Sequence, residues 1–151
     1  MRRQDLALTR EETLAIIDET QYAVLCLTDP DGQPYGLPMD YVRQGDSLYF
    51  HGSQQGRKID AMKSNPRVCA VIVGETEIIP TRFGREYKTA IAEGKVELIN
   101  EPEVKRQVMT WVVERKSPDN IEKGKFVIEK MLDRVLVYKM YMETVSGKHG
   151  L

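Results

Sequence analysis

A run of alternating residues from Arg85 to Ile99 constrains the fold of this chain more than any other part of the sequence. An alternation of this kind is typical of a β-strand, in which successive side chains point to opposite faces. One face of this strand is then small and apolar, so another backbone or a flat ligand can approach it closely. The small face holds Ala90, Ala92, Gly94, Val96 and Leu98, and the polar face holds Thr89, Glu93, Lys95 and Glu97.

Turn residues divide the rest of the chain into shorter strands. Asp29-Pro30-Asp31-Gly32 predicts a tight turn. The run over 22–28 is apolar enough to be buried on both faces, and the prolines at 34 and 38 predict an edge strand or a bulge. The stretch 74–84 has little periodicity and is predicted to be a loop, and residue 149 to lie in a frayed tail. The predicted strands cover 22–28, 34–43, 47–51, 67–73, 85–99 and 134–143.

Helices are predicted from their caps. The motif Thr9-Arg10-Glu11-Glu12 has the form of a capping box, so a helix should run from there to Glu19. A short helix is predicted over 56–64, ending before Asn65-Pro66. Asn100, as an Asx cap followed by Pro102, predicts a helix to about residue 115. A last helix is predicted over 121–130.

The order of these elements indicates the fold class. Clustered strands with interspersed helices, and no regular βαβ alternation, favour an antiparallel α+β fold. Six strands in meander order would close into a β-barrel, because closure removes exposed edges. The length of 151 residues fits a single domain over 1–151.

Composition excludes several classes of protein. A formal net charge of −1 leaves no basic excess for binding nucleic acid. No apolar run approaches the ~18 residues of a membrane span, and the charged start of the chain is unlike a secretory signal, so we expect a cytoplasmic protein with no membrane partner. Cys26 and Cys69 lie in apolar runs and are predicted to be reduced, buried thiols. With two histidines in the chain, no metal site is expected.

The segment from His51 to Lys58 is the most informative for function. A strand ends at His51, a polar loop follows between two glycines, and a helix begins with Arg57 and Lys58. Cations are unfavourable at a helix N-terminus, whose free N–H groups carry partial positive charge. A bound phosphate would relieve this conflict. The alternative is a solvent-exposed helix start without a ligand. The spacing fits neither a P-loop nor a dinucleotide-binding motif.

His51 alternates with Tyr49 on one face of its strand. A single histidine at a strand end is often structural or solvated. In the functional interpretation, His51 is the catalytic residue, which contacts a substrate or donates a proton beside a bound cofactor.

Several motifs, in this order and spacing, together resemble one family. They are Leu48-Tyr49-Phe50-His51-Gly52, Gly56-Arg57-Lys58-Ile59-Asp60, Asn65-Pro66-Arg67-Val68-Cys69 and Tyr87-Lys88-Thr89-Ala90-Ile91. The chain resembles the nitroimidazole-resistance (Nim-like) branch of the pyridoxamine 5′-phosphate oxidase-like, FMN-binding split-barrel superfamily. The resemblance implies a six-stranded split barrel with Greek-key character and a homodimer with FMN at its interface.

The resemblance also implies which residues bind the cofactor. Ser53, Arg57 and Lys58 would hold the FMN phosphate, and the flavin ring would lie against the backbone of Pro38, Met39 and Asp40. Tyr87, Lys88 and Thr89 would face the phosphate or the ring edge, and His51 would lie near the substrate. The segment 75–85 matches no pattern of the family, so the substrate is not identified by the resemblance.

Three functions follow from this resemblance. The first is an FMN-dependent oxidoreductase that reduces a small acceptor such as a nitroaromatic or a quinone. The second is a non-catalytic flavin-binding or sensing protein. The third is a haem-binding split-barrel protein, for which His51 or His149 would supply the axial ligand. Pyridoxamine phosphate oxidation itself is disfavoured, because the arginine-rich C-terminal substrate motifs of the true oxidases are missing.

Overall fold

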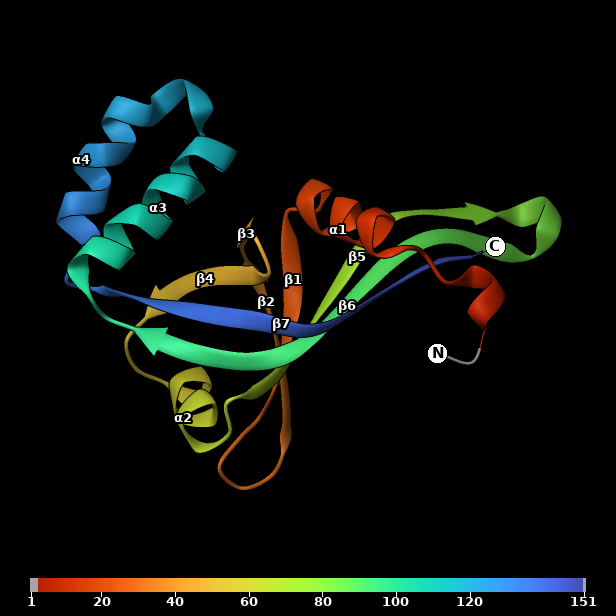
Figure 1. Ribbon diagram of the computed structural model, residues 1–151, viewed down its shortest axis with the longest axis horizontal. Coiled ribbons are helices and arrows are strands. Elements are labelled where there is room, and N and C mark those ends of the chain that lie inside the picture. The colour runs from red at the N-terminus through yellow and green to blue at the C-terminus, as the bar shows by residue number, and fades with distance from the viewer. Residues whose placement is uncertain (1–2, 151) are drawn as a thin grey trace.

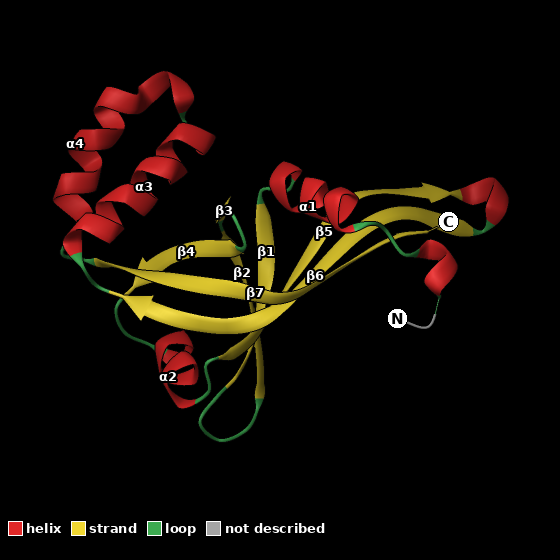
Figure 2. Ribbon diagram, in the orientation of Figure 1, coloured by secondary structure: helices red, strands yellow, loops and turns green. Residues whose placement is uncertain are grey.

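The computed structural model describes residues 3–150, which form a curved antiparallel sheet flanked by helices (Figures 1 and 2). In chain order, the elements are η1 (Gln4–Leu6), α1 (Arg10–Glu19), β1 (Tyr22–Thr28), β2 (Pro34–Asp40), β3 (Val42–Gln44), β4 (Ser47–Ser53), α2 (Arg57–Ser64), β5 (Arg67–Ile79), η2 (Pro80–Arg82), β6 (Gly84–Ile99), α3 (Pro102–Lys116), η3 (Pro118–Asn120), α4 (Ile121–Met131) and β7 (Val135–Gly150).

The seven strands form one sheet in the order β2-β1-β5-β6-β7-β4-β3. The hydrogen-bonded ladder does not close, yet its end strands β2 and β3 are separated in sequence by Tyr41 alone. The sheet therefore curls until its two edges meet at Tyr41, whose buried hydroxyl donates to the carbonyl of Ile17 at 2.5 Å. The predicted α+β split barrel is confirmed, with seven strands instead of six because the predicted strand 34–43 breaks at Tyr41.

The hydrophobic core fills the inside of the curl. Ala90 and Ala92 of β6 are fully buried there, as their alternation predicts. At Gly94 the neighbouring strand comes so close that an added Cβ would lie 1.8 Å from the carbonyl oxygen of Tyr141 in β7. The β6–β7 pairing shifts register at the same point. The prediction that small residues on this face admit another backbone is therefore confirmed.

The outer face of β1 differs from the prediction. Alternate residues of β1 are buried, but Tyr22 is 58% exposed, so burial on both faces is wrong. Cys26 and Cys69 are free and half-buried rather than fully buried, and they lie opposite each other on this outer face. The reason is that the main core fills the inner face of the sheet, and the smaller cluster on the outer face, around Val108 and Val137, lies at β6 and β7 rather than at β1.

The helix starts follow the prediction at α1 and not at α3. The Thr9 side chain and the Glu12 side chain form a complete capping box. At α3 the N-cap residue is Glu101, and the amide oxygen of Asn100 instead accepts a hydrogen bond from Lys105 at 3.0 Å. The predicted Asx cap is therefore wrong, because a buried lysine takes the Asn100 side chain. Within residues 3–150, no helix is long and apolar enough to cross a bilayer.

The predicted loop over 74–84 is wrong. After a bulge, β5 continues to Ile79, and β6 begins at Gly84, so the two strands form a long hairpin. The end of β7 pairs with this hairpin up to Gly150, so residue 149 is not frayed. Residues 74–89 and 144–150 together form a three-stranded extension, here called the arm, that projects from the body of the molecule (Figure 1).

Candidate functional site

The turn between β4 and α2 positions the predicted phosphate-binding residues. Gly56 adopts a φ of +113°, which side-chain-bearing residues rarely adopt, and directs the chain into α2. The Ser53 hydroxyl donates to the carbonyl of Gln55 at 2.9 Å and accepts from the ammonium group of Lys58 at 3.1 Å. The side chains of Ser53, Arg57 and Lys58, at the start of α2, are here called the Lys58 cluster.

Two contacts hold this turn against the sheet. The hydroxyl of Tyr138 in β7 donates to the carbonyl of Ser53 at 2.6 Å. A Cβ on Gly52 would lie 2.9 Å from that hydroxyl and 3.4 Å from Cε of Lys58. Glycine at position 52 therefore leaves space for Tyr138 and Lys58 to approach the backbone, which fixes Ser53 close to the start of the helix.

Arg57 has a protein counter-charge that the sequence argument did not include. Its guanidinium lies 2.9 Å from a carboxylate oxygen of Asp29 and 4.3 Å from the ring centroid of Tyr35. Backbone N–H groups of the turn, first that of Gln33, and then the Arg57 guanidinium stabilise the ionised Asp29 and lower its pKa. A protein carboxylate therefore relieves part of the predicted charge conflict at this helix start. Within residues 3–150, the ammonium group of Lys58 contacts the Ser53 hydroxyl and no carboxylate.

The Lys58 cluster has the donors of an anion site. It combines an ammonium group, a hydroxyl, the N–H groups that Arg57 does not direct at Asp29, and the free amides of the first turn of α2. A phosphate at this point would accept several charge-assisted hydrogen bonds.

The predicted ring-binding strand, β2, lies at one end of the sheet. Pro38 and Asp40 are exposed, and Met39 is half-buried against the core. An edge strand leaves backbone N–H and C=O groups free to bind a ligand. Asp40 also forms an ion pair with Lys116 of α3 at 2.7 Å, so the end of β2 approaches the helices that follow β6.

His51 lies on the face of β4 that the helices α3 and α4 cover. Tyr49 on the same face meets Trp111 of α3 edge-on, with ring centroids 5.3 Å apart. His51 lines a cavity of about 560 Å³ between this face and the two helices, here called the α3–α4 cavity. Its lining is mostly apolar and includes Met109, Val113, Val127, Ile128 and Met131.

The imidazole of His51 forms no hydrogen bond with any of residues 3–150. Its Nδ1 is the one buried side-chain nitrogen or oxygen atom without a partner in the described part of the chain. Burial lowers the pKa of His51, the cation of Lys116 lowers it further, and the carboxylate of Asp40 opposes this. The ring is therefore neutral at pH 7 and has an unused nitrogen for bonding.

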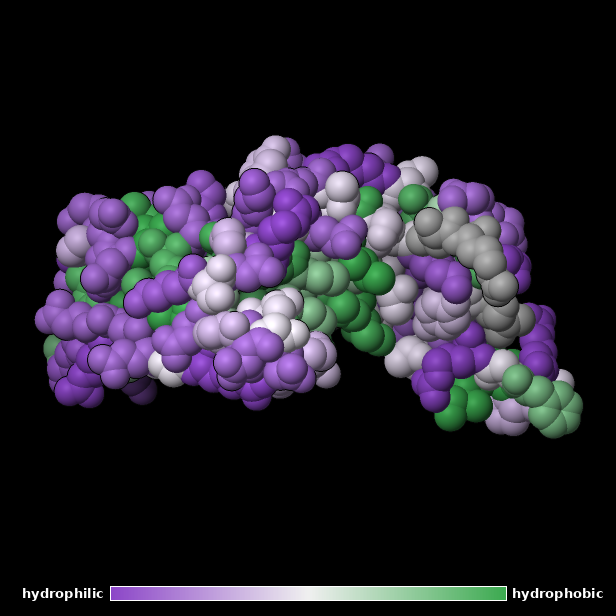
Figure 3. Space-filling model, turned by 90° about the horizontal axis from the view of Figure 1, so that it is seen from below, coloured by the Kyte–Doolittle hydropathy of each residue, from purple (hydrophilic) through white to green (hydrophobic). Residues whose placement is uncertain are grey.

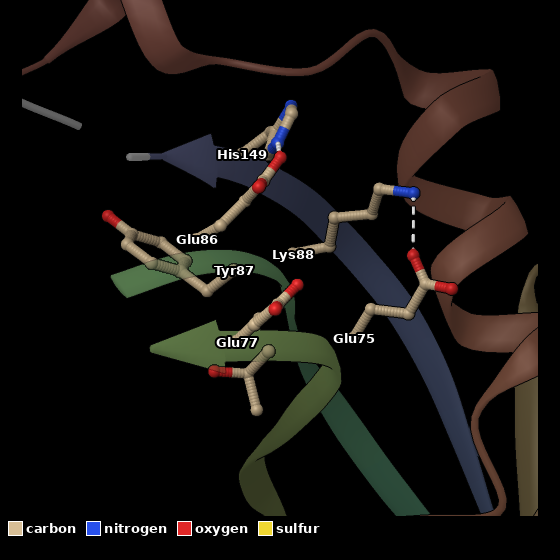
Figure 4. Close-up of a pocket in the computed structure, with 7 residues that line it drawn as sticks. Glu75, Glu77, Glu86, Tyr87, Lys88 and His149 are labelled. Carbon is tan, nitrogen blue, oxygen red and sulfur yellow. Dashed lines mark hydrogen bonds and ion pairs between the residues drawn. The ribbon is translucent and has the colours of Figure 1, made fainter. Parts of the chain in front are cut away.

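The other predicted residues, Tyr87, Lys88 and Thr89, lie in the arm. Figure 4 shows Lys88 directed toward Glu75 and His149 directed toward Glu86, with distances of 3.0 and 3.3 Å. The ammonium group of Lys148 lies 5.2 Å from the ring centroid of Tyr87. In Figure 1, the arm and α2 lie at opposite sides of the molecule, so a single chain does not bring these three residues to the Lys58 cluster.

Sequence reasoning missed the α3–α4 cavity. The signal was present as two apolar pairs at helical spacing, Met109 with Val113 and Val127 with Met131. Such pairs predict an apolar helix face, but they do not show that two helices leave a cavity over one histidine. Tyr138, which holds the turn before α2, was also missed, because its partner lies 85 residues away in sequence.

Comparison with known proteins places these features in a family. Residues 9–149 match the profile of the family described as pyridoxamine 5′-phosphate oxidase. The flavocytochrome Anf3 from Azotobacter vinelandii is similar in structure, with a TM-score of 0.84 and 25% identity, covering 100% of this chain and 72% of that one. A proposed 5-nitroimidazole antibiotic resistance protein from Bacteroides thetaiotaomicron is also similar in structure, with a TM-score of 0.79 and 23% identity. The match covers 95% of this chain and 86% of that one. The FAD and haem binding protein from Mycobacterium smegmatis has a TM-score of 0.81 and 21% identity. The match covers 94% of this chain and 71% of that one.

Proposed function

The chain belongs to the pyridoxamine 5′-phosphate oxidase family, and on that premise we propose that it is a flavoprotein that binds FMN and reduces a small acceptor. The observation that carries the proposal is the Lys58 cluster, where a hydroxyl and an ammonium group meet the free amides of a helix start. The structural likeness to a protein named as a flavocytochrome supports a flavin as the cofactor.

The residues fit the two ends of FMN differently. The phosphate would lie at Ser53, Arg57 and Lys58, where charge-assisted hydrogen bonds are available. The flavin ring would lie along the free edge of β2, at Pro38 to Asp40, where the backbone offers donors and acceptors. In this arrangement the protein binds and orients the cofactor, and FMN supplies the redox chemistry.

The acceptor would enter the α3–α4 cavity beside His51. Its apolar lining suits a planar molecule such as a nitroaromatic or a quinone. The neutral imidazole of His51 is the one polar side chain that β4 contributes to this lining, and it would hydrogen-bond to the acceptor or donate a proton to it.

A second copy of the chain would complete the site. Tyr87, Lys88 and Thr89 lie in the arm, away from the Lys58 cluster of the same chain, and a homodimer could bring the two sets together. The outer face of the sheet supports this arrangement, because Tyr22, Val73 and Ile91 expose apolar side chains there. Figure 3 shows hydrophobic side chains gathered in the hollow between the body and the arm. Exposed apolar patches of this kind mark protein–protein contacts.

The test is FMN binding to the purified protein, measured by the visible spectrum and by quenching of FMN fluorescence. Lys58→Ala should weaken FMN binding by about 10- to 100-fold, because a charge-assisted hydrogen bond contributes about 1.5–3 kcal/mol. Lys63→Ala is the matched control, since Lys63 lies in the last turn of the same helix and should leave the affinity unchanged. Equal affinities of Lys58→Ala and the wild type would show that the phosphate binds elsewhere.

Turnover separates the oxidoreductase from a non-catalytic flavin-binding or sensing protein. We expect NAD(P)H-driven reduction of a nitroaromatic or a quinone by the FMN-loaded protein. Tight FMN binding without reduction of any acceptor would favour the sensing function instead.

A further inference from the structure

The only two cysteines of the chain meet across neighbouring strands. Cys26 of β1 and Cys69 of β5 are direct partners in the antiparallel register, and both are free and half-buried on the outer face of the sheet. Directly opposite residues of an antiparallel pair have Cα atoms about 4.5–5.5 Å apart, which lies within the range of about 4.4–6.8 Å that a disulfide spans. The backbone therefore holds the two Cα atoms at a separation that a disulfide can bridge.

Neither thiol is held by a strong partner. The Cys26 thiol makes one weak hydrogen bond, to the carbonyl of Val24 in its own strand at 3.8 Å. The Cys69 thiol forms no hydrogen bond with any other of residues 3–150. Burial raises the pKa of Cys69, and the neighbouring Cys26 and Glu93 raise it further. The resting form of the pair is therefore a dithiol in which Cys69 stays protonated at pH 7.

A metal ion does not explain the pair. Glu93 of β6 lies opposite Cys69 in the sheet, so the two thiols have a carboxylate as a neighbour. That carboxylate accepts a hydrogen bond from the Thr144 hydroxyl at 3.2 Å. In the described part of the chain, no group of three or more histidine, cysteine, aspartate and glutamate side chains could hold a metal ion. Because structural zinc sites need about four protein ligands, the chemistry open to the pair is that of the thiols themselves.

The place of the pair in the sheet gives a bridge a structural consequence. A bond between residues 26 and 69 would close a loop that contains β2, β3, β4 and α2. It would also fix β1, the strand that pairs with β2 on one side and with β5 on the other. Along the strands, the pair lies four positions from the exposed Tyr22 and Val73, on the side away from the arm. The bridge would therefore restrain the body of the molecule and not the arm.

We propose that Cys26 and Cys69 form a reversible redox site, which a small-molecule disulfide such as oxidised glutathione converts from the dithiol to a cross-strand bridge that locks β1 to β5. The Cys26 thiolate attacks the small disulfide, which forms a mixed disulfide and releases one small thiol. The Cys69 thiolate then attacks the Cys26 sulfur, which forms the bridge and releases the second small thiol. The two cysteines together lose two protons and two electrons, and the small disulfide takes up both.

Treatment of the folded protein with oxidised glutathione tests the proposal. We expect thiol titration to fall from two thiols per chain to none, and peptide mapping without reductant to show Cys26 joined to Cys69. Dithiothreitol should restore both thiols. Cys26→Ser and Cys69→Ser are the matched controls, since each should stop at the mixed disulfide with glutathione, and circular dichroism checks that both are folded. A wild type that keeps both thiols, stops at the mixed disulfide or forms a bridge between two chains would overturn the proposal.

The effect of the bridge on the fold is a second test. Because the closed loop restricts the unfolded chain, oxidation should raise the melting temperature by about 5–10 °C, and reduction should reverse the rise. The double variant Cys26→Ser/Cys69→Ser should respond to neither treatment. Equal melting temperatures of the oxidised and reduced wild type would contradict the lock between β1 and β5. Both tests use the protein without FMN, so the proposed flavin function and the redox site can fail independently.

Discussion

The Lys58 cluster and the α3–α4 cavity lie two residues apart along β4, yet they are built in opposite ways. The cluster takes its side chains from residues 53–58, and they are polar and largely exposed. The cavity joins β4, α3, α4 and β7 around one unsatisfied histidine, with a mostly apolar lining. The comparison teaches that a short polar motif can form an anion site locally, whereas an apolar cavity requires elements that are distant in sequence.

The two regions should also respond differently to substitution. In the exposed cluster, each interaction is weakened by solvent, so single changes should affect ligand binding more than folding. In the cavity, the packing of α3 on the sheet supports both the fold and the binding surface. Changes there should affect stability as well.

The largest effect is expected where α3 packs on the sheet. Trp111→Ala removes the ring that meets Tyr49 and should destabilise the protein by about 2–3 kcal/mol, less than a fully buried tryptophan because Trp111 is half-buried. Urea unfolding measures the loss. FMN binding at the Lys58 cluster should persist in the folded fraction. If the folded Trp111→Ala protein also lost FMN affinity, the Lys58 cluster and the α3–α4 cavity would not be independent of each other.

The next largest expected effect is on FMN affinity, and the two cations of the Lys58 cluster should contribute to it unequally. Arg57→Ala should weaken FMN binding by about two- to tenfold, less than Lys58→Ala, because Asp29 already engages part of the guanidinium. Titration of FMN fluorescence with each of the two variants measures which of them binds FMN more weakly. The urea midpoint of Arg57→Ala should hardly change, since the Arg57 side chain is 54% exposed. The reverse order of affinities would place the phosphate on the Arg57 side of the turn.

The contact from β7 to the turn should have a moderate effect. Tyr138→Phe removes the hydroxyl that donates to the carbonyl of Ser53 and should cost about 1 kcal/mol in the free energy of unfolding. Tyr141→Phe on the same strand is the control, since Tyr141 is 54% exposed. Equal urea midpoints for the two variants would show that this hydrogen bond adds nothing to the stability of the turn.

The smallest effect is a pH dependence from His51. Because burial lowers its pKa below 6.5, the unfolded chain takes up this proton before the folded protein does. The contribution of the neutral ring to stability is therefore fully present above pH 6.5 and decreases as the pH falls toward the lowered pKa. Urea unfolding between pH 7.5 and 5 should show a shallower pH dependence for His51→Gln. Identical slopes would mean that His51 keeps its ordinary pKa.

The sequence predicted most of the fold where the signal was local. Thr9 with Glu12, the turn at 29–32 and the alternation around Ala92 each depend on neighbouring residues, and each is confirmed. The start of α2 at Arg57 is confirmed for the same reason. Local patterns are reliable when the partner groups lie within a few positions of each other.

The prediction was wrong at three places, where a pairing was formed that the local pattern did not indicate. The segment 74–84 forms a hairpin in which β5 pairs with the start of β6, and β7 pairs with the other edge of β6 from Tyr87 onward. Asn100 does not cap α3, because Lys105 takes its side chain. Arg57 has a counter-charge because the turn at Asp29 lies beside α2.

The amino-acid sequence by itself determined most of the strands, the starts of α1 and α2 and the positions of the cations, because backbone propensity and side-chain period act over a few residues. Tertiary structure decided which charges are paired, how far the arm extends and that His51 faces an apolar cavity without a partner. Burial and long-range pairing exist only after the chain has folded, and they set the electrostatic environment on which binding depends.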